Sequence, residues 1–265
     1  MNPKPRNGRQ SDEAQSEELL RARRELAQVT AQLHRLQQRR SSLLAMAAHD
    51  LRTPLAIIQG YSQLLAASLS ADTDAATREY LTTIVGHSAG LANTIENLVA
   101  LDQMERGEMT ISTIRCDLTE LVLSALAQVE GLATVKGLVI HCETPPDPIW
   151  IYADEDQVGR VLYSLFSHGE KYARPGGDLR VEVTVYGGFG RVTLADPRRL
   201  LAAETAARLF DLVEIGHDAR GALAGTDMGL VVARHVAEAH GGGVEAVSSP
   251  EKGTVFTLYL PRSEA

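Results

Sequence analysis

Hydrophobic residues at helical spacing dominate the first part of the chain. One series repeats every seven residues, and a second series fills the other core position of each heptad. The two series are Leu19, Leu26 and Leu33, and Ala22, Val29, Leu36 and Leu43. A seam of this length has to be buried against something, so residues 13–42 are predicted to form a parallel dimeric coiled coil. Residues 1–12 are polar and contain Pro3, Pro5 and Gly8, which favours a disordered tail.

The helical pattern continues beyond the coiled coil as an apolar stripe with steps of three and four residues. Its members are Leu43, Leu44, Ala47, Leu51, Leu55 and Ile58. The helix is predicted to run past Pro54 with a kink there. A polar stretch follows, in which Asp72 or Asp74 is suited to cap a second helix over residues 75–105. Two such hairpins from two chains form a four-helix bundle, so residues 43–107 are assigned to a dimerisation hairpin.

The pattern changes after residue 107, where short strand-like runs alternate with helical stretches. The predicted strands are 110–115, 138–142, 149–153, 181–186, 192–195, 243–247 and 254–260, and the predicted helices are 117–134, 154–172, 202–212 and 228–240. Strands and helices segregated in this way predict a two-layer α/β sandwich over residues 108–265. The fold class of the whole chain is therefore α+β.

Composition narrows the possible partners. A formal net charge of −8 over 265 residues, with no basic patch among aromatic residues, argues against nucleic-acid binding. Cys116 and Cys142 lie far apart without metal-ligand spacing, so we expect two reduced thiols. No stretch approaches eighteen consecutive apolar residues, and the N-terminus lacks the apolar core of a signal peptide. We therefore expect a cytoplasmic protein without membrane insertion.

Three polar residues on the first predicted helix are candidates for chemistry. His49 falls outside the apolar stripe, so it is expected to face solvent or a partner. A neutral imidazole is a competent nucleophile near neutral pH, and the neighbouring Asp50 can orient it and accept its proton. Thr53, four residues after His49, shares its helix face and is placed to position a water molecule. A lone helical histidine is usually only a surface residue, so the surrounding motif has to decide.

That motif, HDLRTPL from His49 to Leu55, resembles the H-box of sensor histidine kinases. The resemblance implies that His49 is the phosphoacceptor, with Asp50 as its acid-base partner and Thr53 serving dephosphorylation of a response regulator. The second half of the chain resembles the catalytic ATP-binding domain of the same family, above all from Gly225 to the end. The resemblance thus implies a fold of the histidine-kinase ATPase type, with ATP and Mg²⁺ as cofactors.

The first nucleotide motif is the N-box, which the stretch SLFSHGEKY at residues 164–172 resembles. Lys171 and Tyr172 match the family pattern. His168, however, stands where the family has an asparagine that ligates magnesium. Magnesium prefers oxygen ligands, whereas imidazole suits softer metals such as zinc. We therefore interpret His168 as a residue that fills space rather than as a metal ligand.

The two glycine boxes also depart from the family pattern. Asp196, which the resemblance implies would recognise the adenine amino group, is present, but the two following glycines are replaced by Arg198 and Leu200. We expect a solvated loop at a closed or collapsed pocket, although direct contact of the arginines with phosphate is an alternative.

The second glycine box keeps Gly225, Thr226, Gly229 and Leu230 as cofactor-binding candidates, while Asp227 replaces its central glycine. A carboxylate there would repel a triphosphate and could cap the following helix instead. Because three different parts of one site are altered, we expect the losses to multiply: about 1.4 kcal/mol at each would reduce affinity roughly a thousandfold.

We therefore predict a homodimeric two-component protein. Its His49 would pass a phosphoryl group to or from the aspartate of a response-regulator receiver domain, or support dephosphorylation of that regulator, with weak or absent ATP use. Another histidine kinase is a candidate phosphoryl donor. Two alternatives stay open: an active ATP-dependent autokinase, and a non-enzymatic dimeric scaffold. Anti-sigma-type serine kinases share the ATP-binding fold but do not explain the hairpin.

Overall fold

The computed structural model describes residues 7–69, 73–211 and 227–263. The chain divides into two compact units, one ending at Ala47 and the other beginning at Ala48. The first unit is the N-terminal part of helix α1 (Asn7–Ser68). Residues 7–12, which the sequence predicts to be disordered, are therefore already helical. Residues 1–6 lie outside the described part.

The heptad seam of the first unit is exposed in the part of the chain that the structure describes. Leu26, Val29, Leu33 and Leu36 are 68%, 52%, 56% and 64% exposed. A single helix cannot bury such a row of large apolar side chains, so the seam needs a second helix from elsewhere. The heptad pattern and the exposed row thus point to the same coiled coil.

The second unit begins with a helical hairpin. Helix α1 continues through Pro54 without ending, and α2 (Ala75–Glu105) begins at Asp74, whose carboxylate accepts a hydrogen bond from the Thr77 amide at 2.8 Å. Asp74 is thus confirmed as the cap, whereas the alternative, Asp72, lies outside the described residues. The two helices meet through Ala48, Leu55, Ala92, Ile95 and Val99.

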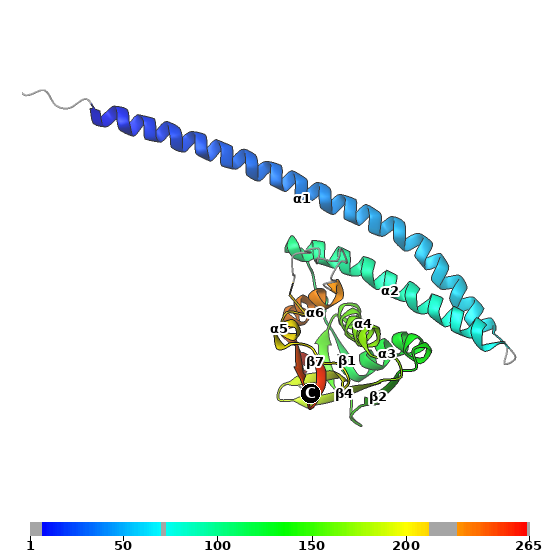
Figure 1. Ribbon diagram of the computed structural model, residues 1–265. Coiled ribbons are helices and arrows are strands. Elements are labelled where there is room, and N and C mark those ends of the chain that lie inside the picture. Colours follow the sequence, from blue (N-terminus) through cyan, green and yellow to red (C-terminus); the bar gives the residue numbers. More distant parts are fainter. Residues whose placement is uncertain (1–6, 70–72, 212–226, 264–265) are drawn as a thin grey trace, which may run out of the picture. The chain divides into compact units, whose positions relative to one another are not determined.

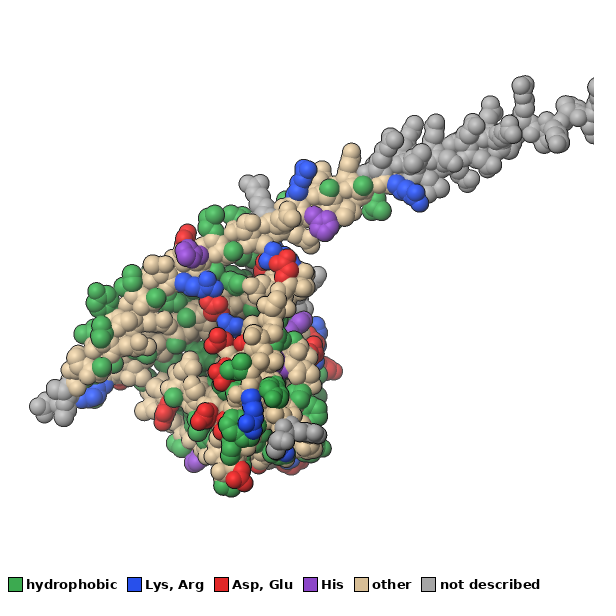
Figure 2. All heavy atoms as spheres, turned by 180° about the vertical axis from the view of Figure 1, so that it is seen from behind, with side chains coloured by type: hydrophobic (Ala, Val, Ile, Leu, Met, Phe, Trp, Pro, Cys, Tyr) green, Lys and Arg blue, Asp and Glu red, His purple; other side chains and the backbone are tan. Residues whose placement is uncertain are grey.

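Much of the predicted apolar stripe of α1, and several large apolar residues of α2, are nevertheless exposed on the hairpin. Leu51 and Ile58 of α1 are 50% and 48% exposed, and Ile84 and Leu91 of α2 are 44% and 50% exposed. Figure 2 shows hydrophobic side chains standing out along the helices of the hairpin. A sequence stripe that is only half buried within one chain is what a bundle shared by two chains would require.

The rest of the second unit is a layer of helices packed on a sheet (Figure 1). Its elements are β1 (Ile114–Asp117), α3 (Leu118–Val135), β2 (Val139–Glu143), β3 (Trp150–Ala153), α4 (Glu155–Tyr172), β4 (Asp178–Tyr186), β5 (Phe189–Asp196), α5 (Ala203–Ala207), α6 (Met228–Ala239), β6 (Gly243–Ser249) and β7 (Gly253–Pro261). The main sheet has the order β2-β4-β5-β7-β6, and all its pairs are antiparallel except β2 with β4. Strands β1 and β3 form a separate antiparallel pair. The two-layer α/β sandwich is confirmed.

Two predicted elements differ from the structure. The first strand lies at 114–117 instead of 110–115, because it pairs with β3 in the register Ile114 to Ala153. The predicted helix 202–212 is reduced to α5, which has five residues. Its start lacks a side-chain cap, and the chain turns after it so that Phe210 can enter the core, where it is 2% exposed.

Alternation of side chains decides which polar residues point into the sandwich. On β5, Val192, Leu194 and Asp196 share the inward face, so Asp196 is buried at the end of that strand. On α4, the core residues Val161 and Leu165 precede His168 by seven and three positions, which places His168 on the same buried face. The main fold therefore delivers an aspartate and a histidine into one interior region.

Helix α2 also belongs to the sandwich core. Its Ala100 is part of the large core cluster, and Leu101 and Met104 pack against that cluster. Helix α3, although its length and apolarity alone would suffice to cross a membrane, contributes Val122, Leu126 and other buried residues to the same core. Figure 1 shows α3, α4 and α6 between α2 and the sheet.

Asp117 offers a test of how the sandwich is assembled. Its Oδ1 accepts hydrogen bonds from the amides of Thr119 and Ile149, each at 3.0 Å, so one carboxylate caps α3 and fixes the chain before β3. We expect Asp117→Ala to lower the free energy of unfolding by about 1–2 kcal/mol. The measurement is denaturant unfolding followed by circular dichroism, with the exposed Asp147→Ala as control. Equal midpoints for the two variants would contradict this account.

Candidate functional site

The three candidate residues of the first motif lie on one exposed stretch of α1. His49, Asp50 and Thr53 are all exposed. The imidazole of His49 is therefore accessible to a partner protein. Two neighbours on the other side of the helix, Ala48 and Leu55, are buried against α2 at 2% and 4% exposure. The helix is thus anchored on one side and presents His49 on the other, as the sequence predicts.

The second candidate region centres on His168, which is 3% exposed. Its Nδ1 lies 3.0 Å from Oδ2 of Asp227, and its Nε2 lies 3.1 Å from Nη1 of Arg199. A guanidinium group can only donate, so Nε2 must accept, and the ring proton resides on Nδ1, where Asp227 accepts it. The result is a row of two hydrogen bonds in which a neutral imidazole joins a carboxylate to a guanidinium.

Aromatic rings enclose this row. The His168 ring lies 4.6 Å from the ring of Tyr172 and 5.3 Å from that of Phe256, measured between centroids. The Arg199 guanidinium lies over the Tyr172 ring at 4.6 Å, and the Lys171 ammonium lies 5.1 Å from the same ring. These cation–π contacts hold both cations at the edge of the cluster.

Burial sets the charge state of the imidazole. Loss of hydration lowers the pKa of His168 below its ordinary value; the hydrogen bond and charge of Asp227 oppose this shift, and Arg199 and Lys171 reinforce it. Burial also lowers the pKa of the Arg199 guanidinium, while Asp196 and Tyr172 oppose that shift. A neutral His168 is what the hydrogen-bond geometry requires, so geometry and electrostatics agree.

Asp227 has a second role at the start of α6. Its Oδ1 accepts a hydrogen bond from the Gly229 amide at 3.2 Å, which makes Asp227 the N-cap of the helix. The predicted cap is therefore confirmed. The partial positive charge at this helix end, which would otherwise attract an anion, is already matched by a carboxylate of the chain itself.

Asp196 presents a different picture from Asp227. It is 4% exposed, and its Oδ1 accepts a hydrogen bond from the Arg198 amide at 3.0 Å. Its Oδ2 is buried and has no hydrogen-bond partner among the described residues. A buried carboxylate oxygen in this state is suited to accept a hydrogen bond from a ligand donor such as an amino group.

Residues 39–107 match the His Kinase A phospho-acceptor domain, and residues 153–264 match the family of histidine kinase-, DNA gyrase B- and HSP90-like ATPases. The two matches coincide with the exposed His49 and with the cluster around His168. The chain belongs to the sensor histidine kinase family.

Relatives and solved structures support this membership. The chain is 28% identical over 231 residues to sensor protein KdpD of Escherichia coli strain K12, which covers 86% of this chain and 25% of that protein. It is 26% identical over 239 residues to sensor protein DivL of Caulobacter vibrioides, covering 90% and 30%. The chain thus spans between a quarter and a third of the length of these two relatives.

The similar solved structures concern the fold alone, because their sequence identity is low. ShkA, crystallised full-length in complex with AMPPNP, has a TM-score of 0.58 at 22% identity and covers 84% of this chain and 46% of its own. The Acinetobacter baumannii histidine kinase AdeS has a TM-score of 0.52 at 22% identity and covers 82% and 98%. Both support the order of helical hairpin and sandwich.

MgATP, which the family implies, fits only part of the site. Oδ2 of Asp196, which has no hydrogen-bond partner in the described ranges, suits the amino group of adenine. The position of the magnesium ligand does not fit, because both ring nitrogens of His168 are engaged within the protein and imidazole is a poor magnesium ligand. The phosphate side does not fit either, because the Asp227 carboxylate stands at the helix N-terminus.

The structure also shows what the sequence did not reveal. Arg199 is a partner of His168, so the prediction of a wholly solvated loop is wrong for this residue; Arg198 remains exposed and contacts Gly176 and Asp178. Gly229 and Leu230 are buried at the start of α6, and Lys171 and Tyr172 are exposed at the end of α4. Gly225 and Thr226 lie outside the described residues. The contact of Phe256 with the His168 ring was not predicted.

The buried state of His168 predicts a pH effect on stability. Its pKa is lower in the folded than in the unfolded chain, where it is near the ordinary 6.5. Between the two values the unfolded chain binds more protons, so the stability contributed by neutral His168 is present above about pH 6.5 and is lost below it. We expect the imidazole resonance of His168 to titrate below 6.5 in an NMR titration, and His168→Gln to flatten the loss of stability below about pH 6.5.

The exposed His87 of α2 provides the control. His87→Gln should leave the slope of stability against pH in this range as it is in the wild type. A titration midpoint of His168 above 6.5 would show that Asp227 holds it as a charged pair and would reject the neutral row.

Proposed function

We propose that this chain acts as the phosphotransfer part of a two-component pathway while making little or no use of ATP itself. An imidazole nitrogen of His49 attacks the phosphoryl group on the aspartate of a receiver domain. The new P–N bond forms as the P–O bond to that carboxylate breaks, and Asp50 accepts the imidazole proton. The reverse step returns the group, and with Thr53 placing a water molecule the same surface supports dephosphorylation.

The observation that carries this proposal is the closed row of Asp227, His168 and Arg199. Both ring nitrogens of His168, which stands at the family's magnesium-ligand position, are engaged by protein partners. The Asp227 carboxylate stands at the helix end that would face a phosphate. Neither transfer between His49 and a receiver nor dephosphorylation requires that site. The exposed His49 and the closed site are thus compatible in one protein.

A homodimer is part of the proposal. The heptad seam of the first unit and the half-exposed stripes of the hairpin both need an apolar partner. A second copy of the chain supplies matching surfaces for both at once, since the same residues repeat in it. The His Kinase A match over residues 39–107 supports this assembly, because the domain is in general a dimeric one that acts on response regulators.

One observation favours the alternative of an active autokinase. The buried Oδ2 of Asp196 accepts no hydrogen bond from any described residue, which leaves it available to an adenine amino group. ATP binding would then have to open the row at His168. The other alternative is a non-enzymatic scaffold. The exposed heptad seam favours it, whereas the surroundings of His49 give it no support. The two alternatives differ from the proposal in measurable ways.

Phosphorylation of the full chain separates the three functions. We expect no acid-labile label from radioactive MgATP in the wild type or in His49→Ala, and transfer from phosphorylated receiver domains to the wild type only. Label from MgATP on the wild type alone would establish an autokinase and contradict the proposal. The receiver domains are tested as a panel from one genome. If neither the wild type nor His49→Ala changes the phosphorylation of any of them, the scaffold is favoured.

The charge of Asp227 gives a second test, by nucleotide binding. Asn at this position keeps the helix cap and an acceptor for His168 but removes the negative charge. We expect Asp227→Asn, and likewise Asp227→Gly, to raise the affinity for MgATP roughly tenfold, which corresponds to about 1.4 kcal/mol. Isothermal titration calorimetry measures this.

Asp156→Asn is the matched control for that test. It removes one carboxylate at the other end of α4, about 18 Å from His168 along the helix, and should leave the affinity unchanged. If Asp227→Asn and Asp227→Gly also leave it unchanged, the carboxylate does not exclude the nucleotide.

A further inference from the structure

Glu96 lies on α2 between two packed faces of that helix. Ala92, Ile95 and Val99 face the part of α1 that carries His49. Asn93 and Ala100 face the sandwich, where Asn93 donates to Ser164 of α4 and Ala100 joins the core. A residue at the border of these two faces can contact both α1 and the sandwich. Glu96 contacts both, through Arg52 of α1 and Arg160 of α4.

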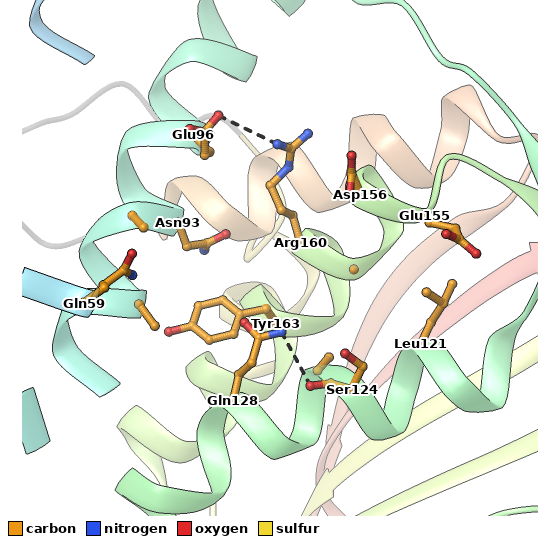
Figure 3. A pocket seen from close by; sticks show the side chains of 14 residues that line it. Gln59, Asn93, Glu96, Leu121, Ser124, Gln128, Glu155, Asp156, Arg160 and Tyr163 are labelled. Atoms are coloured by element: carbon orange, nitrogen blue, oxygen red, sulfur yellow. Dashed lines mark hydrogen bonds and ion pairs between the residues drawn. The ribbon is translucent and has the colours of Figure 1, made fainter. Parts of the chain in front are cut away.

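Two arginines converge on the Glu96 carboxylate. Arg52 of α1 binds it in a bidentate manner, with Nε to Oε1 at 2.6 Å and Nη2 to Oε2 at 3.1 Å. Arg160 of α4 approaches the same Oε2 with Nη1 at 3.7 Å. Figure 3 shows this second ion pair spanning one side of a pocket of about 470 Å³ between α2 and α4. Oε2 is therefore shared by a group three residues after His49 and a group of the ATPase-like domain.

The helix that carries Glu96 is closely fitted to the sandwich. A Cβ added to Gly229 of α6 would lie 2.7 Å from Oγ of Ser164 and 3.0 Å from Nδ2 of Asn97. A Cβ added to Gly86 of α2 would lie 2.4 Å from the Leu132 side chain of α3. These close approaches show that α2 packs directly on α3 at Gly86 and on the start of α6 at Gly229. Glu96 therefore lies on a helix that is packed against the same domain that carries Arg160.

We propose that Glu96 is a positioning residue that couples the ATPase-like domain to the turn of α1 bearing His49, with Arg160 as the domain's contact. Two guanidinium groups that share one carboxylate oxygen repel each other and are attracted by Glu96. Loss of Arg160 therefore changes how firmly Glu96 holds Arg52, and through Arg52 the backbone of the His49 turn. This gives the ATPase-like domain a means of adjusting the phosphoacceptor without binding a nucleotide.

The size of the effect follows from the exposure of the groups. The side chains of Arg52, Glu96 and Arg160 are 46%, 30% and 30% exposed. Ion pairs at such sites contribute little to global stability, although bidentate geometry fixes orientation well. The coupling should therefore appear in the local dynamics of the His49 turn and not in the unfolding midpoint.

Hydrogen exchange on the full chain tests the coupling. We expect Arg160→Gln to change the exchange of amides in residues 48–56 by about two- to fivefold. Glu96→Gln should change the exchange of the same amides. In the double variant, Arg160→Gln should cause no further change in exchange beyond that of Glu96→Gln. Arg160→Lys, which keeps the charge, should restore most of the wild-type exchange.

Arg191→Gln is the matched control. Arg191 has a similar exposure of 28%, contacts Glu182 and Thr184 on the sheet, and has no contact with α2 in the described part of the chain. It should leave the exchange of residues 48–56 unchanged. An unchanged exchange in Arg160→Gln, or effects of the two substitutions that simply add, would overturn the proposal, provided that the variants keep the wild-type circular dichroism.

The proposal rests on the proposed function only in treating His49 as the phosphoacceptor. Chemical phosphorylation of His49 by phosphoramidate, in which the imidazole replaces ammonia on phosphorus, is measured in the same variants. A changed rate in Arg160→Gln and an unchanged rate in Arg191→Gln support the coupling. Failure of His49 to exchange phosphoryl groups with any receiver would reject the proposed function, while the exchange result would still decide the role of Glu96.

Discussion

The buried imidazole of His168 is the group to which the rest of the nucleotide region is adjusted. A histidine that is 3% exposed must have both ring nitrogens satisfied, and here Asp227 and Arg199 satisfy them. Each partner is thereby fixed: Asp227 neutralises the start of α6, and Arg199 lies against Tyr172. The three residues thus form one hydrogen-bonded unit. Their effects on ligand binding should be coupled, and the simple multiplication expected for separate sites does not apply.

This unit is also consistent with the way α2 lies on the sandwich. Asn97 of α2 and Ser164 of α4 close around Gly229, which directly follows the start of α6. The N-terminus of α6, which would face a phosphate, is therefore capped by the Asp227 carboxylate and packed against α2. Closure of the site and attachment of the hairpin reinforce each other, because both depend on a compact start of α6.

Local patterns in the sequence predicted the helices and strands well. They did not predict the contacts between residues that are distant in the sequence. The caps Asp74, Asp117 and Asp227 act on amides two or three residues ahead, so residue type and spacing suffice to find them. The contact between His168 and Arg199 spans 31 residues and depends on how α4 meets the end of β5. Ile84 and Leu91 belong to a stripe that a single chain leaves exposed, because periodicity reports burial without saying which chain provides it.

The two halves of the protein obey different structural constraints, so substitutions in the nucleotide region need not disturb the helix that carries His49. His49 needs only an exposed helix face, which Ala48 and Leu55 secure through their contacts with α2. The sandwich needs its core, to which the buried His168 adds volume. Substitutions at the nucleotide region therefore cost the fold little as long as they satisfy one another. The shared carboxylate of Glu96 links the ATPase-like domain to the helix that carries His49.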